Sequence, residues 1–143
     1  MLRVVLLLLL VLPGVILSAA EDWGRNHYRL PAYTVYDGDT LTGATVELDF
    51  GVALLRQSVR LANFDAPEIS RVRQTVRVTD AEIARGKQAR DDLAALLKTG
   101  DVWISPSGDG KSVYGRLEAD VWLVKDGKQT NVVEWMKEKG HVR

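Results

Sequence analysis

The chain has 143 residues, of which 19 are basic and 19 acidic, and it contains no cysteine. This length supports one domain with its own hydrophobic core and is too short for two. The balanced charge excludes a protein that coats nucleic acid with a cationic surface, and the lack of cysteine excludes a disulfide scaffold.

The first twenty residues differ in composition from the rest of the chain. Arg3 precedes an uncharged run over residues 4–17, and small residues follow up to Ala20. This order predicts a secretory signal peptide, residues 1–20, with cleavage after Ala20. The alternative is an uncleaved membrane anchor, although a spanning helix needs about 20 apolar residues. We therefore expect a secreted or periplasmic domain of residues 21–143, with a membrane-anchored domain as the alternative.

Three strands are predicted in the first half of the chain. Residues 21–30 are polar with scattered aromatics and predict an N-terminal arm. Strands at 32–36, about 45–50 and 55–64 follow, with short connections that favour a meander. In the second strand Val46, Leu48 and Phe50 alternate with polar residues, so these three should share the buried face.

Two helices are predicted in the second half. Residues 69–79 lack helical periodicity and predict an exposed loop that carries Arg71, Arg73 and Arg77. The segment 79–82 has the form of a capping box, with Thr79 as the cap, and opens a helix that runs to about Lys98. The last helix is expected from about Asn131 to Gly140.

A short strand at 102–105, a turn at 106–110 and a strand at 113–124 lie between these helices. Together the elements predict a mainly β fold with helices, of class α+β. We expect a five-stranded OB-fold barrel of the Greek-key type, with a helix between strands 3 and 4 and a C-terminal helix.

Three short segments carry the residues that suggest chemistry. Asp37-Gly38-Asp39-Thr40 supplies two carboxylates, Arg60 is followed by Asp65-Ala66-Pro67-Glu68, and Tyr114-Gly115-Arg116 supplies a second arginine. Each segment alone has an ordinary alternative: a turn, a strand end, or an arginine paired with a neighbouring acid. In combination, from about Thr34 to Gly140, they resemble the staphylococcal (thermo)nuclease family.

The resemblance implies a role for each of these residues. It implies that Ca²⁺ is held by Asp39, Asp65 and the backbone carbonyl of Ala66. It implies that Glu68 is the general base or water-orienting residue and that Arg60 and Arg116 clamp the phosphate. Tyr114 matches a position that contacts the bound nucleotide, with an ordinary strand tyrosine as the alternative.

Elementary chemistry agrees with these implied roles. Calcium prefers hard oxygen ligands, and the planar fork of arginine donates two parallel hydrogen bonds to a phosphate. Asp39, Asp65 and Glu68 with the two arginines carry a net charge of −1, which repels a phosphate. A bound Ca²⁺ would make that charge +1, so we expect activity to require a divalent cation.

The resemblance implies a calcium-dependent nuclease that hydrolyses phosphodiester bonds of DNA or RNA, leaves 3′-phosphate products and prefers single strands. We expect a monomer. The alternative is a non-catalytic OB-fold module that binds an oligonucleotide or a protein ligand. Three departures from the family's pattern stand out: Ala66 where threonine is frequent, Val113 where some members have lysine, and an end at Arg143 that omits a further C-terminal helix.

Overall fold

The computed structural model describes residues 26–71, 77–111 and 115–143, with the backbone alone at 109–111. The predicted signal peptide lies outside the described residues, as do Arg73, Val113 and Tyr114. Within these ranges, no helix has both the length and the apolar character needed to cross a membrane.

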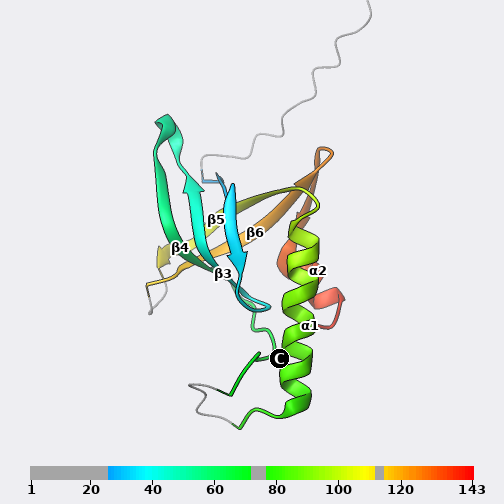
Figure 1. Ribbon diagram of the computed structural model, residues 1–143. Coiled ribbons are helices and arrows are strands. Elements are labelled where there is room, and N and C mark those ends of the chain that lie inside the picture. Colours follow the sequence, from blue (N-terminus) through cyan, green and yellow to red (C-terminus); the bar gives the residue numbers. More distant parts are fainter. Residues whose placement is uncertain (1–25, 72–76, 112–114) are drawn as a thin grey trace, which may run out of the picture.

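Seven strands form one sheet in the described part of the chain (Figure 1). They pair in the order β1-β5-β6-β4-β3-β2, with β7 added beside β6. Their bounds are Tyr28–Arg29 (β1), Ala32–Val35 (β2), Thr40–Glu47 (β3), Ala53–Leu61 (β4), Asp101–Lys111 (β5), Leu117–Lys125 (β6) and Lys128–Asn131 (β7). The hydrogen-bonded path ends at β1 and β2, so the sheet is not closed, and it has seven strands where the predicted OB-fold barrel has five. The mixed α+β class is confirmed, and the arrangement is consistent with an OB-like fold.

The central part of the sheet follows the predicted order. β2 pairs with β3 and β3 with β4, both antiparallel, which is the expected meander. β4 then pairs in parallel with β6, with Arg60 registered with Glu118. This parallel pairing is long-range in sequence and places the start of β6 next to β4.

Two short strands at the margins were not predicted. Tyr28–Arg29, expected in an arm, pairs with Ile104 and Trp103 of β5. Lys128–Asn131 turns back on β6 after the tight turn at Asp126 and Gly127. The helix expected between strands 3 and 4 therefore follows the fourth strand, because β1 adds a strand ahead of the meander.

β5 continues through the segment predicted as a turn. Pro106 is registered with Ala119 of β6, and a register shift follows before Lys111. Proline has no amide hydrogen, so it tolerates a strand position whose other side is unpaired. Among the described residues, β1 pairs with β5 at Ile104 and Trp103 and does not extend to Pro106.

The hairpin between β3 and β4 also differs from the prediction. β3 ends at Glu47, and a 3₁₀ turn over Asp49–Gly51 follows, in which Phe50 has φ +62°. The Phe50 side chain is fully exposed, with a relative accessibility of 103%. The alternation in the sequence placed Phe50 in the core, but the strand stops three residues too early for that pattern to apply.

Both predicted helices are confirmed, together with their caps. α1 (Asp80–Leu97) begins after Thr79, whose side chain accepts a hydrogen bond from the amide of Glu82 at 3.2 Å. α2 (Val132–Glu138) begins after Asn131, which caps the amide of Glu134 at 3.1 Å. Such caps satisfy amides that the first helical turn leaves without partners.

α1 lies beside the sheet and α2 lies near it (Figure 1). α1 contributes Ala89, Leu93 and Leu97 to the core, and α2 contributes Val132, Val133 and Met136. Full burial of one leucine side chain contributes about 1.5–3 kcal/mol to folding. This packing fixes α1 next to the loop that follows β4, where the predicted site residues lie.

Candidate functional site

The predicted site lies where β3 begins and β4 ends. Thr40 is registered with Arg60 in this antiparallel pair, so Asp39, one residue before β3, reaches the end of β4. The backbone carbonyl of Asp39 accepts a hydrogen bond from the amide of Leu61 at 2.9 Å.

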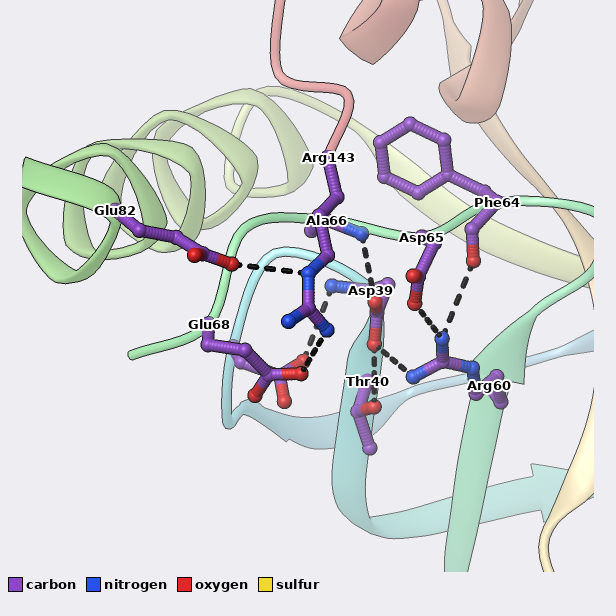
Figure 2. A network of polar contacts seen from close by, with 10 residues as sticks. Asp39, Thr40, Arg60, Phe64, Asp65, Ala66, Glu68, Glu82 and Arg143 are labelled. Carbon is purple, nitrogen blue, oxygen red and sulfur yellow. Dashed lines mark hydrogen bonds and ion pairs between the residues drawn. The ribbon is translucent and has the colours of Figure 1, made fainter. Parts of the chain in front are cut away.

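Asp39 is buried, with a relative accessibility of 3%, and both oxygens of its carboxylate accept hydrogen bonds. Oδ1 accepts from Arg60 and, at 2.9 Å, from the Thr40 hydroxyl. Oδ2 accepts from the amide of Ala66 at 2.9 Å. Asp39 therefore ties together β3, β4 and the loop that follows β4 (Figure 2).

Arg60 joins the two aspartates that the sequence singled out. Its Nη1 contacts Asp39, and its Nη2 donates to Asp65 Oδ1 at 2.7 Å and to the Phe64 carbonyl at 3.4 Å. The structure thus brings Asp39, Arg60 and Asp65 together, and it places the backbone of Ala66 against Asp39. One guanidinium thus bridges two carboxylates, with one charge-assisted hydrogen bond to each.

The surroundings of Asp39 disfavour the negative charge of its carboxylate. Burial raises the pKa of the Asp39 carboxyl to about 6, and the neighbouring Asp37 carboxylate raises it as well. The Ala66 amide, Arg60 and Thr40 lower this pKa without offsetting the burial. Asp37 also accepts from the amide of Asp39 at 3.1 Å, which holds the turn that presents Asp39. Any cation bound beside Asp39 would favour its ionised form.

Two glycines allow the segments of the site to approach one another. A Cβ at Gly38 would lie 2.6 Å from the Ala66 Cβ and 3.0 Å from the Ala89 Cβ. A Cβ at Gly86, on α1, would lie 2.3 Å from the Glu68 carbonyl oxygen and 2.5 Å from that of Pro67. α1 therefore packs directly on the backbone that carries Glu68.

Substituting Gly86→Ala should destabilise the protein, although alanine favours a helix over glycine by about 1 kcal/mol. The new methyl group clashes with backbone atoms, which cannot move aside as the end of a side chain can, and such overpacking costs about 1–3 kcal/mol. Urea unfolding measures the change in the free energy of unfolding. Lys87→Ala, at an exposed position of the same helix, is the control and should have little effect. A Gly86→Ala protein more stable than the wild type would contradict this close approach.

Glu68 faces into the same site from the loop after β4. Its Oε1 pairs with Arg143 Nη1 at 3.0 Å, and its side chain is 25% exposed. Burial raises the pKa of Glu68 above its usual range, Arg143 opposes this, and Asp39, Asp65 and Glu82 raise the pKa further. Glu68 therefore lies among the carboxylates of Asp39, Asp65 and Glu82, and its side chain keeps partial access to solvent.

Arg143 and Glu82 belong to this site and were missed from the sequence. Arg143 Nε pairs with Glu82 Oε1 at 2.9 Å, and its backbone amide donates to the Asp65 carbonyl at 3.0 Å. Figure 2 shows the guanidinium of Arg143 between Glu68 and Glu82. Local patterns could not find this contact, because Arg143 lies 75 residues after Glu68 in the sequence.

The second predicted phosphate clamp, Arg116, immediately precedes β6. Leu117 is registered with Val59 and Glu118 with Arg60 in the parallel pair. Glu118 lies on the same face of the sheet as its registered partner Arg60. Alternate residues of a strand share a face, so Arg116, two residues before Glu118, would lie on that face if β6 continued by one residue. Arg116 is half-buried. The predicted nucleotide contact, Tyr114, lies outside the described residues.

The oxygen atoms of the site suit a hard cation, but the protein side chains alone do not complete a metal site. In the ranges that the structure describes, no three acidic or histidine side chains converge closely enough to hold a metal ion. The set inferred from the sequence needs only two carboxylates, those of Asp39 and Asp65, completed by the Ala66 carbonyl and by water. Carboxylate, carbonyl and water oxygens are the ligands that calcium takes in proteins.

Comparison with protein families gives a match that extends from β4 to the end of the given sequence. Residues 58–143, more than half of the chain, match the family model described as staphylococcal nuclease homologue. The matched segment contains Arg60, Asp65, Glu68 and Arg116 but begins after Asp39, which the structure joins to it through Arg60 and Ala66. A search of curated proteins finds no match.

Proposed function

Because the chain belongs to the staphylococcal nuclease homologue family, we propose that it is a calcium-dependent nuclease that hydrolyses phosphodiester bonds of DNA and RNA. The observation that carries the proposal is the contact of Asp39 with Arg60, and of Arg60 with Asp65, beside Glu68. These residues combine hard oxygen ligands, a cation for the phosphate and an accessible carboxylate within one site.

Asp39, Asp65 and the Ala66 carbonyl would hold the calcium ion. The raised pKa of Asp39 supports this assignment, because a buried carboxylate beside Asp37 gains from a neighbouring cation. When bound, calcium supplies positive charge to the phosphate and holds it in place.

Glu68 would orient the attacking water and accept its proton. A bond then forms between the water oxygen and phosphorus, and the bond between phosphorus and the 5′ oxygen breaks. The 5′ oxygen takes up a proton from solvent and leaves as a hydroxyl group, and the other product ends in a 3′-phosphate. A carboxylate with a raised pKa is the better base near neutral pH, and burial raises the pKa of Glu68.

Arg60 and Arg116 would stabilise the phosphate as it gains negative charge in the transition state. Arg60 forms ion pairs with Asp39 and Asp65. Cation binding at those carboxylates would weaken these ion pairs and leave the guanidinium more available to the phosphate.

The proposal extends to the location and the substrate of the enzyme. Residues 1–20 would direct export to the periplasm or the medium, or anchor the domain if they are retained. Because an OB-type surface binds splayed bases and backbone, single-stranded DNA or RNA is the preferred substrate. The domain would act as a monomer.

Cleavage of labelled single-stranded DNA and RNA tests the proposal, with calcium and with a chelator. We expect cleavage with calcium and almost none in chelator, because the carboxylates without a cation repel the phosphate. Equal rates under the two conditions would remove the metal from the mechanism. No cleavage by folded protein under either condition would favour a non-catalytic module that binds an oligonucleotide or a protein ligand.

A further inference from the structure

The segment that follows α2 runs back to the candidate site and is held there by several contacts. The amide of His141 donates to the Met136 carbonyl at 3.0 Å, and its ring pairs with Asp92 of α1 at 2.7 Å. Two residues later, the amide of Arg143 donates to the Asp65 carbonyl at 3.0 Å. Residues 140–143 therefore form a strap from α2, across α1, to the loop after β4.

The strap places one guanidinium between two carboxylates from different elements. Arg143 donates a hydrogen bond from Nη1 to Glu68 Oε1 at 3.0 Å, and its Nε forms an ion pair with Glu82 Oε1 of α1 at 2.9 Å, without hydrogen-bond geometry. The Glu82 side chain is only 14% exposed and that of Arg143 29%. Ion pairs in such partly buried positions are screened less by salt than those at the surface.

Without this guanidinium, the Glu68 carboxylate would face like charges on several sides. Asp39, Asp65 and Glu82 all act on Glu68 electrostatically, and each disfavours its negative charge. Glu68 is part-exposed, so it could turn towards solvent and relieve that repulsion. The pairing with Arg143 opposes such a turn and directs the carboxylate inward.

We propose that Arg143 is a positioning residue of the nuclease site, which holds the Glu68 carboxylate in place by bridging it to Glu82. The proposal rests on the proposed function, in which Glu68 orients the attacking water. Arg143 acts through Glu68 and needs no contact with the substrate. Its effect therefore belongs to the catalytic step and not to substrate binding.

The test compares kcat and KM of Arg143→Ala with those of the wild type, on single-stranded DNA with calcium. Displacing a catalytic group by about 1 Å can cost about 100-fold, so we expect kcat to fall by about 10- to 100-fold with KM within about threefold. Glu82→Gln, which removes the ion pair between Arg143 and Glu82, should also lower kcat. Arg143→Lys should recover only part of the loss, because an ammonium group lacks the fork that reaches both carboxylates.

Lys139→Ala is the matched control, because it removes a nearby exposed cation that contacts Trp135 and not Glu68. Its kcat should equal that of the wild type. Added guanidinium ion at millimolar concentration should restore part of the activity of Arg143→Ala, which a loss of general stability would not allow.

Two results would overturn the proposal. In one, Arg143→Ala keeps the wild-type kcat. In the other, its kcat rises, which would identify Arg143 as a competitor of the bound cation. Failure of the proposed function itself looks different, because the wild type would then cleave no faster than Glu68→Gln.

Discussion

Replacing Glu68 by glutamine should lower kcat for phosphodiester hydrolysis by about 10²- to 10⁴-fold, the contribution expected of a general base. Glutamine keeps the size of the side chain and one oxygen that can accept from Arg143, but it cannot accept the proton of the attacking water. The fold should remain intact, because the change also removes one negative charge from a site where Asp39, Asp65 and Glu82 repel it. Steady-state kinetics on single-stranded DNA with calcium measure the effect.

The control for this substitution is Glu138→Gln, an exposed position of α2 that makes the same chemical change away from the site. It should leave kcat unchanged. If Glu68→Gln retained activity within a factor of about five of the wild type, the change in the free-energy barrier would be only about 1 kcal/mol, and Glu68 would not be the base. The water would then have to be activated by another group.

Replacing Arg60 by alanine should reduce both activity and stability. Loss of one group that stabilises transition-state charge lowers kcat by about 10²- to 10³-fold. In addition, the buried Asp39 carboxylate loses its cationic partner, which should cost up to about 3 kcal/mol in the free energy of unfolding. Hydrolysis rates and urea unfolding, the latter without metal, measure the two effects separately.

The stability loss of Arg60→Ala should depend on pH in a definite direction. The pKa of Asp39 is raised to about 6 in the folded wild type, and removal of Arg60 raises it further. At pH 5 the Asp39 carboxyl is mostly protonated in both folded proteins, so removing the Arg60 cation lowers the free energy of unfolding by a smaller amount. At pH 8 the carboxylate is ionised in the wild type, and the full cost appears. An equal loss at both values would show that Arg60 stabilises the fold by packing alone.

Arg29→Ala is the control for Arg60→Ala. Arg29 also bridges two acids, Glu47 and Asp101, but at the surface. Exposed pairs of this kind contribute about 0–1 kcal/mol, so the control should lose little stability and no activity. Arg60→Lys should be more stable than Arg60→Ala, because it keeps a cation near Asp39, yet it should remain less active because it lacks the planar fork.

α1 shows what the sequence predicts well. Thr79 as the cap and leucines at helical spacing are local signals, and the structure places the helix at Asp80–Leu97. Short strands with no such pattern escape local reasoning. Tyr28–Arg29 and Lys128–Asn131 are strands only because β5 and β6 offer edges to pair with.

The residues of the site likewise fall into those that the sequence predicts and those that it does not. Asp39, Arg60 and Asp65 were assembled from motif spacing and a resemblance, and the structure brings their side chains into contact. Their roles remain predictions. Arg143 has no motif, because its position depends on how α2 packs and on the strap that follows, and neither property can be read from neighbouring residues.

The exposed tip of the β3–β4 hairpin affects how the protein behaves in concentrated solution. Phe50, Val52 and Leu55 all project into solvent there, and the whole chain carries no net charge at pH 7. Proteins near zero net charge have little mutual repulsion to keep apolar surfaces apart. Solubility should therefore be lowest near neutral pH, and self-association through this tip should diminish when Phe50 is replaced by a charged residue.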